Sequence, residues 1–493
     1  MTAGALVQSA GGGLVQSGGQ RRRGAQLGNL RVRRGRRTQQ VVQVERPAVS
    51  RPQRPGVLYL ILGFLTVILA GTVLLMLPIA TEDRESAGFM RALFTSTSAV
   101  CVTGLVVTDT RAYWSTFGEV TILALIQLGG LGFMTSSTLL LLFFGRRLSV
   151  AQRVISGETT FRLGQESLGD LVRRIVGLTL VTEAAGAVLL IAFFTVHDRS
   201  FSLEPAWRGL FTAVSAFNNA GFDIEGGGRS LTQYGGNPGV LLTVAALTIV
   251  GGLGYAVVWD VKQSRRWSRF TLNSKIVLLT YGMLMVAGMV VIFASEAFRG
   301  GSLASLPLPQ AALSAFAEST YARTSGFTAF DLGRVQPEIL MFMAALMFIG
   351  GASASTAGGI KVTTFSALYF AIIASVRGDE HVHVFGREIP WRQINRALAV
   401  ALLSVAIVFA SGFALHLVSD APTDHILFEA VSAFATTGLS AGITGTLDAA
   451  GQAILVVTMF VGRLGPLTIA LALAARFRGA ERIRYPEADL SIG

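Results

Sequence analysis

Four short polar segments that each end on a glycine are the part of this sequence best suited to bind a bare cation. They occupy residues 98–104, 215–221, 320–326 and 432–438 of the 493-residue chain. A small cation that sheds its water shell needs a ring of oxygens, and backbone carbonyls supply one when the chain runs extended. Glycine reaches the unusual dihedral angles that this path requires. We therefore predict that the four segments meet around one cation pore.

Each glycine segment lies at the end of an apolar stretch that is too short to cross a bilayer. These stretches are 88–99, 205–217, 309–321 and 424–434. They alternate with runs long enough to cross about 30 Å of hydrocarbon. The runs are 57–79, 118–144, 175–196, 239–259, 274–294, 337–349 with 360–376, 396–418 and 450–475. We predict eight spans and four re-entrant half-helices, whose negative C-terminal ends would face the pore and favour cations.

The order of span, half-helix, glycine segment and span occurs four times. We therefore predict an all-α membrane protein in which four tandem span–pore-half-helix–span repeats surround one central pore. The repeats are 57–145, 170–262, 274–376 (with a broken second span) and 393–476. A basic tail (1–56) precedes them and a cytoplasmic C-terminus (477–493) follows.

Composition excludes a water-soluble enzyme, and the position of the charges argues against a nucleic-acid binder. Only 14% of the residues are charged, against about 25% in a soluble domain, and the mean hydropathy is +0.56. The formal net charge of +12 is concentrated in residues 1–56, which hold 11 arginines and one acid, Glu45. We predict a disordered tail that lies on membrane lipids, and no nucleic-acid partner.

Lysine and arginine are concentrated in the tail and in the loops 145–174, 262–275, 377–396 and 476–486. Because cytoplasmic loops carry the positive excess, we predict a multi-pass plasma-membrane protein with both termini in the cytoplasm. His381 and His383, within one of these loops, are predicted to be solvated and not metal ligands. The single cysteine, Cys101, excludes an intramolecular disulfide and a thiolate metal site.

The second span of the third repeat is interrupted by residues 350–359, which contain four glycines. Each glycine costs about 1 kcal/mol relative to alanine in a helix interior, so the helix should unwind, and unwound backbone must be buried in protein or face water. We predict a flexible gate beneath the ion site; a static kink is the alternative. The predicted gate residues are Gly350, Gly351, Ser353, Ser355, Thr356, Gly358, Gly359, Lys361 and Arg463.

Arg463 stands out when the repeats are aligned on a second glycine landmark. Three repeats have Gly130, Gly252 or Gly351 where the fourth has Arg463, and these glycines could equally serve close helix packing. An arginine within a span costs about 2.5–3.5 kcal/mol. We predict that Arg463 donates hydrogen bonds to the gate carbonyls and forms a positive barrier; snorkelling to the surface is the alternative. Lys361 either anchors the loop or is a plain interface lysine.

The glycine segments resemble the filter loops of the Trk/Ktr/HKT superfamily of potassium transporters. The matching residues are 103–105, 217–222, 324–327 and 436–439, together with 350–361 and 462–468. By this resemblance K⁺, the only metal expected, binds at the filter. The implied filter residues are Val102, Thr103, Gly104, Asn219, Ala220, Gly221, Thr324, Ser325, Gly326, Thr436, Thr437 and Gly438. We assign no role to Cys101 or Arg323 beside it.

The resemblance implies potassium uptake through a selective pore, with no enzymatic activity and no covalently bound cofactor. Eight spans are more similar to the KtrB-type membrane subunit than to the TrkH type, which has two more. A homodimer and a cytosolic, nucleotide-binding RCK-type regulatory subunit are the implied partners. Glycine at all four filter positions resembles the potassium-preferring members, because some sodium-favouring plant relatives have serine at the first.

Other functions are kept as alternatives. A Na⁺-coupled or Na⁺-permeable transporter of the same superfamily differs only in the ion. A secondary transporter for another solute typically uses inverted repeats, whereas these repeats are parallel. A membrane-embedded enzyme needs convergent acids, but the candidates are single, and Glu183 is expected to meet a polar partner in the bundle. The candidates are Glu183, Asp260, Glu318 and Glu429. The absence of a phosphate-binding motif argues against a pump.

Overall fold

The computed structural model describes residues 55–145, 168–199, 202–298 and 301–465. The chain divides into Met1–Gly56 and Val57–Gly493, and the second unit holds the helices described below. The predictions for residues 1–54 of the basic tail, for the C-terminus at 477–493 and for motif positions 466–468 lie outside the described residues.

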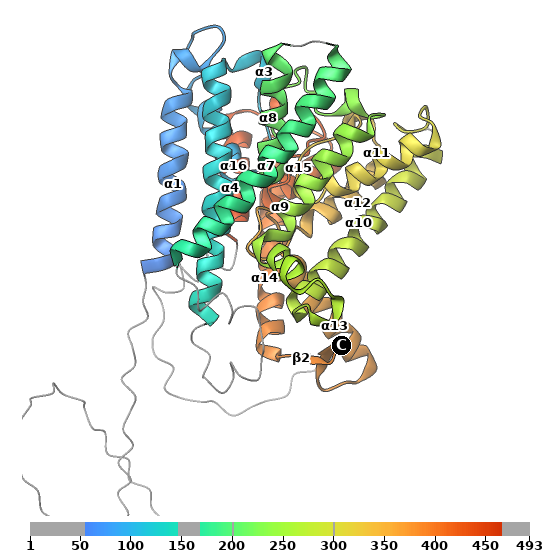
Figure 1. Ribbon diagram of the computed structural model, residues 1–493. Helices are drawn as coiled ribbons and strands as arrows, with labels where there is room; N and C mark the ends of the chain where they lie inside the picture. Colours follow the sequence, from blue (N-terminus) through green and yellow to red (C-terminus); the bar gives the residue numbers. More distant parts are fainter. Residues whose placement is uncertain (1–54, 146–167, 200–201, 299–300, 466–493) are drawn as a thin grey trace, which may run out of the picture. The chain divides into compact units, whose positions relative to one another are not determined.

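Helices form at all the predicted apolar stretches (Figure 1). The first helices of the four repeats are α1 (Pro55–Leu75), α7 (Leu168–Asp198), α10 (Leu272–Phe298) and α14 (Trp391–His416). The predicted half-helices are α2 (Phe89–Val100), α8 (Leu203–Asn218), α11 (Leu308–Tyr321) and α15 (Thr423–Ala435). The closing helices are α4 (Thr116–Gly145), α9 (Pro238–Ser264), the pair α12 (Pro337–Phe348) and α13 (Val362–Arg377), and α16 (Ala449–Leu464).

Five of these helices are long and apolar enough to cross a membrane. The qualifying segments are Thr116–Thr135, Gly169–Asp198, Pro238–Ser264, Leu272–Phe298 and Trp391–His416. Shorter apolar helices are Ile61–Leu75, Pro337–Phe348, Val362–Arg377 and Ala449–Leu464. At about 1.5 Å per residue, a 27-residue helix such as α9 exceeds the hydrocarbon thickness. The chain is therefore a multi-pass membrane protein, whereas eight crossings stay a prediction.

Helix ends follow local chemistry. Pro238 begins α9, where a missing N–H is tolerated, and the side chain of Asn237 accepts hydrogen bonds from the next two N–H groups. Asp448 caps α16 in the same way, accepting from Gly451 N–H. These caps fix the starts of two closing helices, α9 and α16, after the return segments of their glycine loops.

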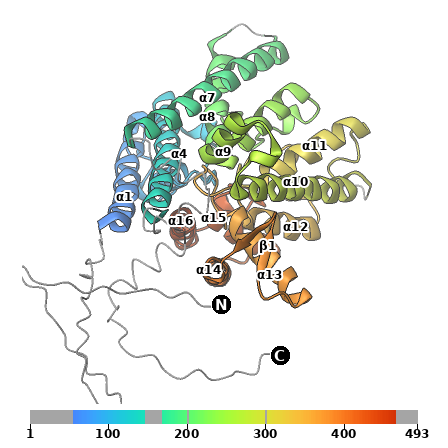
Figure 2. The ribbon, with the colours of Figure 1, turned by 60° about the horizontal axis from the view of Figure 1, so that its bottom comes forward.

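The repeats contact one another in a closed cycle. The contacting pairs are α4 with α8, α9 with α11, α12 with α15, and α16 with α2. Figure 2 shows the same order around the body: α1 and α4, then α7 and α9, then α10 and α12, then α14 and α16. The half-helices thus lie inside a ring of longer helices, which brings their C-terminal ends together.

The loop that contains the two histidines includes a short hairpin that the sequence did not predict. Within 377–396 the chain forms a hairpin of β1 (Val382–Val384) and β2 (Arg387–Ile389). Its two-residue turn is left-handed at Phe385 and Gly386, which matches the twist of the strands. The two histidines are exposed there as predicted, and no group of potential metal ligands occurs among the described residues.

The second glycine landmark comprises residues 129–132, 251–254, 350–353 and 462–465. Its first glycine serves close packing in three repeats, the alternative that the sequence left open. A Cβ at Gly129, Gly251 or Gly462 would lie closer than 3.0 Å to a backbone carbonyl. Those carbonyls belong to Val100, Phe217 and Phe434, each four residues before the filter glycine of its own repeat. The closing helix therefore presses directly on the C-terminal end of the half-helix in three repeats.

We expect Gly251→Ala to destabilise the protein, because its Cβ would collide with the Phe217 carbonyl. Overpacking of this kind costs about 1–3 kcal/mol. Gly282→Ala is the matched control: Gly282 lies within α10, and no neighbouring atom is within 4 Å of its Cβ position. That change should be neutral or stabilise by up to about 1 kcal/mol. Thermal unfolding in one detergent compares the two, and equal midpoints would contradict the close packing.

Candidate functional site

The four glycine loops, residues 102–104, 219–221, 324–326 and 436–438, are brought together by the structure. All of these residues are buried except Gly438, which is half-buried. Every glycine has a left-handed φ: +94° at Gly104, +70° at Gly221, +76° at Gly326 and +94° at Gly438. This is the conformation that glycine adopts without steric cost, as the sequence predicted.

The loops meet head to tail in a closed ring. The Cα of each glycine lies against the backbone carbonyl that precedes the glycine of the next repeat. The successive pairs are Gly104 with Ala220 O, Gly221 with Ser325 O, Gly326 with Thr437 O, and Gly438 with Thr103 O. The cycle closes from the fourth repeat to the first, so all four loops contribute equivalent carbonyls to one place.

These four carbonyls have no hydrogen-bond donor among the residues that the structure describes. Buried backbone carbonyls are nearly always paired, because an unpaired one loses the hydrogen bond it had to water. A fourfold set of unpaired carbonyls at one junction is therefore costly without a ligand. A cation that exchanges its water oxygens for these carbonyls would compensate them.

Sequence reasoning missed a second left-handed position, two residues before each glycine. The φ values are 55° at Val102, 60° at Asn219, 75° at Thr324 and 49° at Thr436. Only the asparagine is a residue type that favours this region; β-branched residues there are strained. The strain at Val102, Thr324 and Thr436 means that packing, not local preference, sets the path of these three loops.

Buried acids hold the glycine loops and their return segments. Glu318 accepts hydrogen bonds from Ala329 N–H at 2.9 Å and Thr328 Oγ1 at 3.2 Å, and Glu429 accepts one from Thr444 Oγ1. Each acid lies on a half-helix and binds the return segment of the same repeat. These carboxylates are thus single structural acceptors, which agrees with the absence of a catalytic pair.

Glu183 of α7 meets polar partners in the bundle, as predicted. Its two carboxylate oxygens accept hydrogen bonds from Gln127 Nε2 at 3.1 Å and Asn218 Nδ2 at 2.9 Å. Asn218 directly precedes the second glycine loop, and Glu183 is only 4% exposed. The cluster therefore ties α4 and α7 to the base of that loop.

The interrupting loop, residues 350–359, unwinds as the sequence predicted. Helix α12 ends at Phe348 and α13 begins at Val362. Two short segments at the ends of the interrupting loop, residues 349–351 and 360–362, are paired with each other by backbone hydrogen bonds. We call this pair of segments the neck. The bonds are Gly350 N–H to Ile360 O (3.0 Å), Ile360 N–H to Phe348 O (3.2 Å) and Val362 N–H to Gly351 O (3.0 Å).

The remaining part of the interrupting loop, residues 352–358, is its tip and packs on α9. Ala352 N–H donates to Gly252 O at 2.9 Å, and Thr356 N–H donates to Gly251 O at 3.3 Å. Gly254, where α9 is kinked at φ 72° and ψ 161°, lies directly against the tip. The second landmark of repeat two thus forms the seat of the loop.

Arg463 reaches the tip from the fourth repeat. It is 1% exposed, and its guanidinium donates to Thr356 O at 2.5 Å and Gly129 O at 3.4 Å. The predicted hydrogen bond to the loop is confirmed, and the snorkelling alternative is wrong because the side chain is buried. Lys361 Nζ donates to Ala357 O at 2.5 Å, so it contacts the loop and is not a plain interface lysine.

Comparisons with known proteins now decide the family. The model of the TrkH family, described as cation transport protein, matches residues 47–479. This chain belongs to the TrkH family. It is an ion transporter and not an enzyme.

Curated relatives of this TrkH-family chain carry potassium uptake in their names. The Ktr system potassium uptake protein B of Bacillus subtilis is 38% identical, over 88% of this chain and 96% of its own length. The potassium/sodium uptake protein NtpJ of Enterococcus hirae is 33% identical, over 87% and 96%. The crystal structure of the potassium transporter TrkH from Vibrio parahaemolyticus shares the fold, with a TM-score of 0.69 at 16% identity, over 88% of this chain and 87% of that one.

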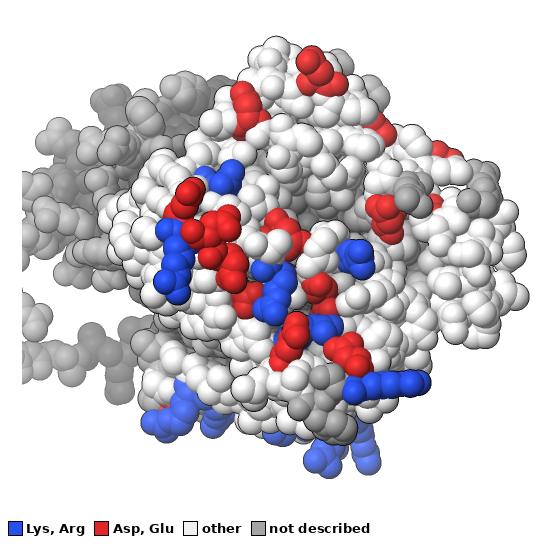
Figure 3. Space-filling model, turned by 90° about the horizontal axis from the view of Figure 1, so that it is seen from above, with Lys and Arg blue, Asp and Glu red and all other residues white. Residues whose placement is uncertain are grey.

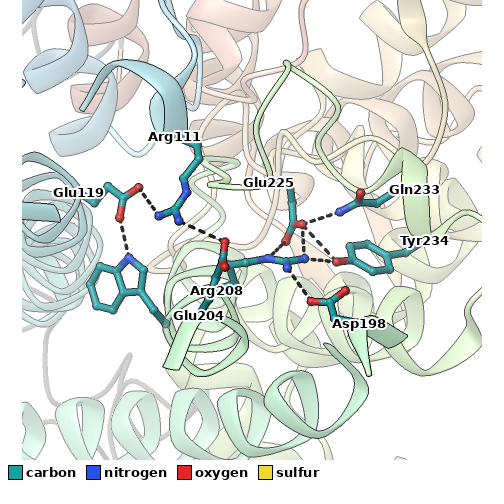
Figure 4. Close-up of polar contacts among 9 residues, drawn as sticks. Arg111, Glu119, Asp198, Glu204, Arg208, Glu225, Gln233 and Tyr234 are labelled. Atoms are coloured by element: carbon teal, nitrogen blue, oxygen red, sulfur yellow. Dashed lines mark hydrogen bonds and ion pairs between the residues drawn. The ribbon is translucent and has the colours of Figure 1, made fainter. Parts of the chain in front are cut away.

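A charged network on the upper face of this TrkH-family chain, as it is oriented in Figure 1, was not predicted from the sequence. Arg208 of α8 donates to Glu225 at 2.5 Å and 3.2 Å, to Asp198 at 2.7 Å and to the Tyr234 hydroxyl (Figure 4). Figure 3 shows acidic and basic side chains side by side on this upper face. The network fixes the segment that follows the second glycine loop to its own half-helix.

A neighbouring cluster joins the first two repeats of the TrkH-family fold. Arg111 of α3 (Thr110–Tyr113) contacts Glu119 at 3.3 Å and Glu204 at 3.1 Å, and Trp207 Nε1 donates to Glu119 at 2.6 Å (Figure 4). Asp223, in the segment that follows the second glycine loop, accepts the N–H of Glu225 at 3.1 Å. Burial, with the nearby carboxylates of Glu225 and Asp109, raises the pKa of Asp223 to about 7.

Replacing Asp223 should change how stability depends on pH. Because its folded pKa of about 7 exceeds its ordinary value of 3.8, the folded chain holds a proton that the unfolded chain releases, and stability falls as pH rises between the two values. Asp223→Asn keeps an acceptor for the Glu225 N–H without the charge. Its stability advantage over the wild type should therefore grow across this window and stay constant above it.

Thermal unfolding of purified protein at acidic, neutral and alkaline pH measures this difference. The exposed Asp83, replaced by asparagine, is the control and should give a curve parallel to that of the wild type. An Asp223→Asn curve that also runs parallel to the wild type would contradict a half-buried carboxyl that holds a proton near neutral pH.

Proposed function

We propose that this chain takes up K⁺ through a selective pore lined by the four glycine loops. The observation that carries the proposal is the closed ring of carbonyls of Thr103, Ala220, Ser325 and Thr437, which contact the glycine of a neighbouring loop and accept no hydrogen bond from the described residues. The four half-helices that end at this ring add partial negative charge, which favours a cation over an anion.

Potassium is the proposed ion because all four loops have glycine at the equivalent position and because relatives are named as potassium uptake proteins. Glycine lets the carbonyl of the next loop stay in the ring, because a Cβ at this position would displace that carbonyl. Na⁺ is the alternative ion, and the name of the potassium/sodium uptake protein NtpJ supports it. Uptake of the two ions by the same preparation distinguishes these possibilities.

The interrupting loop is the proposed gate, with Arg463 as its latch. Its tip is buried, seated on α9 and bound by Arg463. The hydrogen-bond partners of Arg463 are backbone carbonyls and not carboxylates. Its positive charge is therefore not neutralised, and it repels a passing cation strongly because the surroundings have a low dielectric constant. The loop blocks conduction while Thr356 O is held, and releasing that carbonyl opens the path.

The proposed setting is the plasma membrane, with both termini in the cytoplasm and the basic tail on lipid. The Ktr system names of the relatives support a separate regulatory component, which we propose to be a cytosolic, nucleotide-binding RCK-type subunit acting on a homodimer. Its proposed docking surface is the basic segment 262–275, which has five Lys and Arg and no acid.

Expression in a strain that lacks K⁺ uptake tests the function. The wild-type chain should restore growth at low external K⁺. Gly104→Ser should retain less discrimination against Na⁺, because the new side chain would displace the Ala220 carbonyl from the ring and is strained at φ +94°. Uptake of K⁺ in the presence of competing Na⁺ measures this. Full K⁺ preference in Gly104→Ser would contradict the role of the first loop, and no growth with the wild type would contradict the function.

Arg463→Ala should increase K⁺ uptake when the regulatory signal is absent. A hydrogen bond from a charged group contributes about 1.5–3 kcal/mol, which corresponds to roughly a tenfold or larger shift from closed to open. The exposed Arg229, replaced by alanine, is the matched control and should leave uptake unchanged. Initial rates of uptake compare the variants. Unchanged uptake and unchanged regulation in Arg463→Ala would remove the latch from the mechanism.

A further inference from the structure

A second buried arginine, Arg323, lies beside the ion site and has no place in the mechanism so far. It follows the half-helix α11 and directly precedes the third glycine loop, 324–326. Its side chain is 0% exposed, and with Arg463 it is among the largest fully buried side chains described. The other three repeats have Cys101, Asn218 and Ala435 at this position. The arginine therefore belongs to the repeat that also carries the interrupting loop.

The partners of Arg323 come from two other elements. Its guanidinium donates to Tyr281 O of α10 at 3.0 Å and to Gly350 O at 2.6 Å, with a weaker bond to Ile349 O at 3.4 Å. It also lies 3.9 Å from the centre of the Tyr281 ring, within the range of a cation–π contact. One side chain thus joins α10, the third glycine loop and the first half of the neck.

The planar guanidinium is suited to this position. Arginine presents several N–H groups in a rigid fork and stacks on aromatic rings, and it remains charged when buried. A lysine ammonium is a compact point donor without a planar face. It cannot donate to the carbonyls of Tyr281 and Gly350 and at the same time stack on the Tyr281 ring. Thr324, the next residue, packs directly on Gly350, so the neck and the third glycine loop are in contact at this point.

The two arginines hold different parts of the interrupting loop. Arg323 binds the neck, where the two ends of the loop are also paired with each other by backbone hydrogen bonds. Arg463 binds the tip at Thr356. The tip is also held by the Gly251 and Gly252 carbonyls and by the Phe217 carbonyl, all of another repeat. Lys361 of the neck donates to Ala357 O of the tip. None of the bonds that seat the tip on α9 is one of the backbone bonds that pair the two sides of the neck.

We propose that Arg323 is the positioning residue that fixes the neck of the interrupting loop to the third glycine loop, so that the gate opens by moving its tip about a stationary neck. The proposal rests on the proposed gating function and extends it. Arg463 then controls how often the tip is seated, whereas Arg323 keeps the neck and the third glycine loop in register in both states.

Hydrogen exchange in the purified full-length chain tests the division between neck and tip. Arg323→Gln should accelerate exchange of the neck amides, Gly350, Ile360 and Val362. Arg463→Ala should accelerate exchange at Ala352 and Thr356 of the tip and leave the neck protected. This measurement does not require transport, so its failure is distinguishable from a failure of the proposed function.

Uptake measurements give the matching functional prediction. Arg323→Gln and Arg323→Lys should lower the maximal K⁺ rate about tenfold and reduce discrimination against Na⁺, because the third glycine loop loses its support. Arg463→Ala should raise the rate and keep discrimination. Tyr281→Phe is the control: the Tyr281 hydroxyl has no hydrogen-bond partner in the described chain, so this variant keeps the ring and the carbonyl and should behave as wild type.

Two results would overturn the proposal. One is normal neck protection and normal K⁺/Na⁺ discrimination in Arg323→Gln. The other is faster exchange at the tip alone in that variant, which would place Arg323 with the latch. If Arg323 variants do not accumulate, Tyr281→Leu, which removes only the ring contact, must show faster neck exchange and weaker discrimination; a wild-type result for it would equally overturn the proposal.

Discussion

Backbone that leaves the helix at membrane depth must find partners for its carbonyls, and the architecture of this chain depends on how that constraint is met. The four glycine loops and the interrupting loop are both non-helical and buried. In the interrupting loop the carbonyls of Gly350 and Thr356 accept from Arg323 and Arg463. In the glycine loops the equivalent oxygens are left without a donor in the described chain. The same physical deficit thus underlies both the proposed gate and the proposed cation site.

Departures from repeat symmetry separate these two uses. The glycine loops keep the symmetry closely: left-handed φ occurs at the same two positions in all four. Three closing helices press a glycine on their half-helix, but in the third repeat Gly350 lies against Gly358 of its own loop instead. Both buried arginines belong to this departure, Arg323 within the third repeat and Arg463 opposite the loop. In the proposed pore, one asymmetric quarter would allow conduction to change without a rearrangement of all four loops.

Sequence alone predicted the features that depend on local composition. Half-helices, glycine positions and the broken helix follow from stretch length and glycine content, and Arg463 was found because three repeats have glycine there. The left-handed Val102, a β-branched residue, was missed because only packing from neighbouring repeats imposes it. The neck contact of Arg323 was missed for the same reason, since 27 residues separate it from Gly350. The network of Arg208 joins α7, α8 and the return segment, and no local sequence pattern predicts pairing between such distant residues.

Burying an arginine charge costs free energy unless neighbouring groups stabilise the charge. The groups around the two buried arginines of the proposed cation pathway therefore matter. Arg323 stacks on Tyr281 and Arg463 lies 4.4 Å from the Phe133 ring. Each charge is therefore offset by a ring and by carbonyl dipoles, which stabilise it without neutralising it as a carboxylate would. A carbonyl bound by guanidinium is unavailable to an ion. In the proposed gate, the seated tip would therefore oppose a cation in two ways through the contact at Thr356: the positive charge would repel the cation, and the oxygen that could replace its water would be occupied.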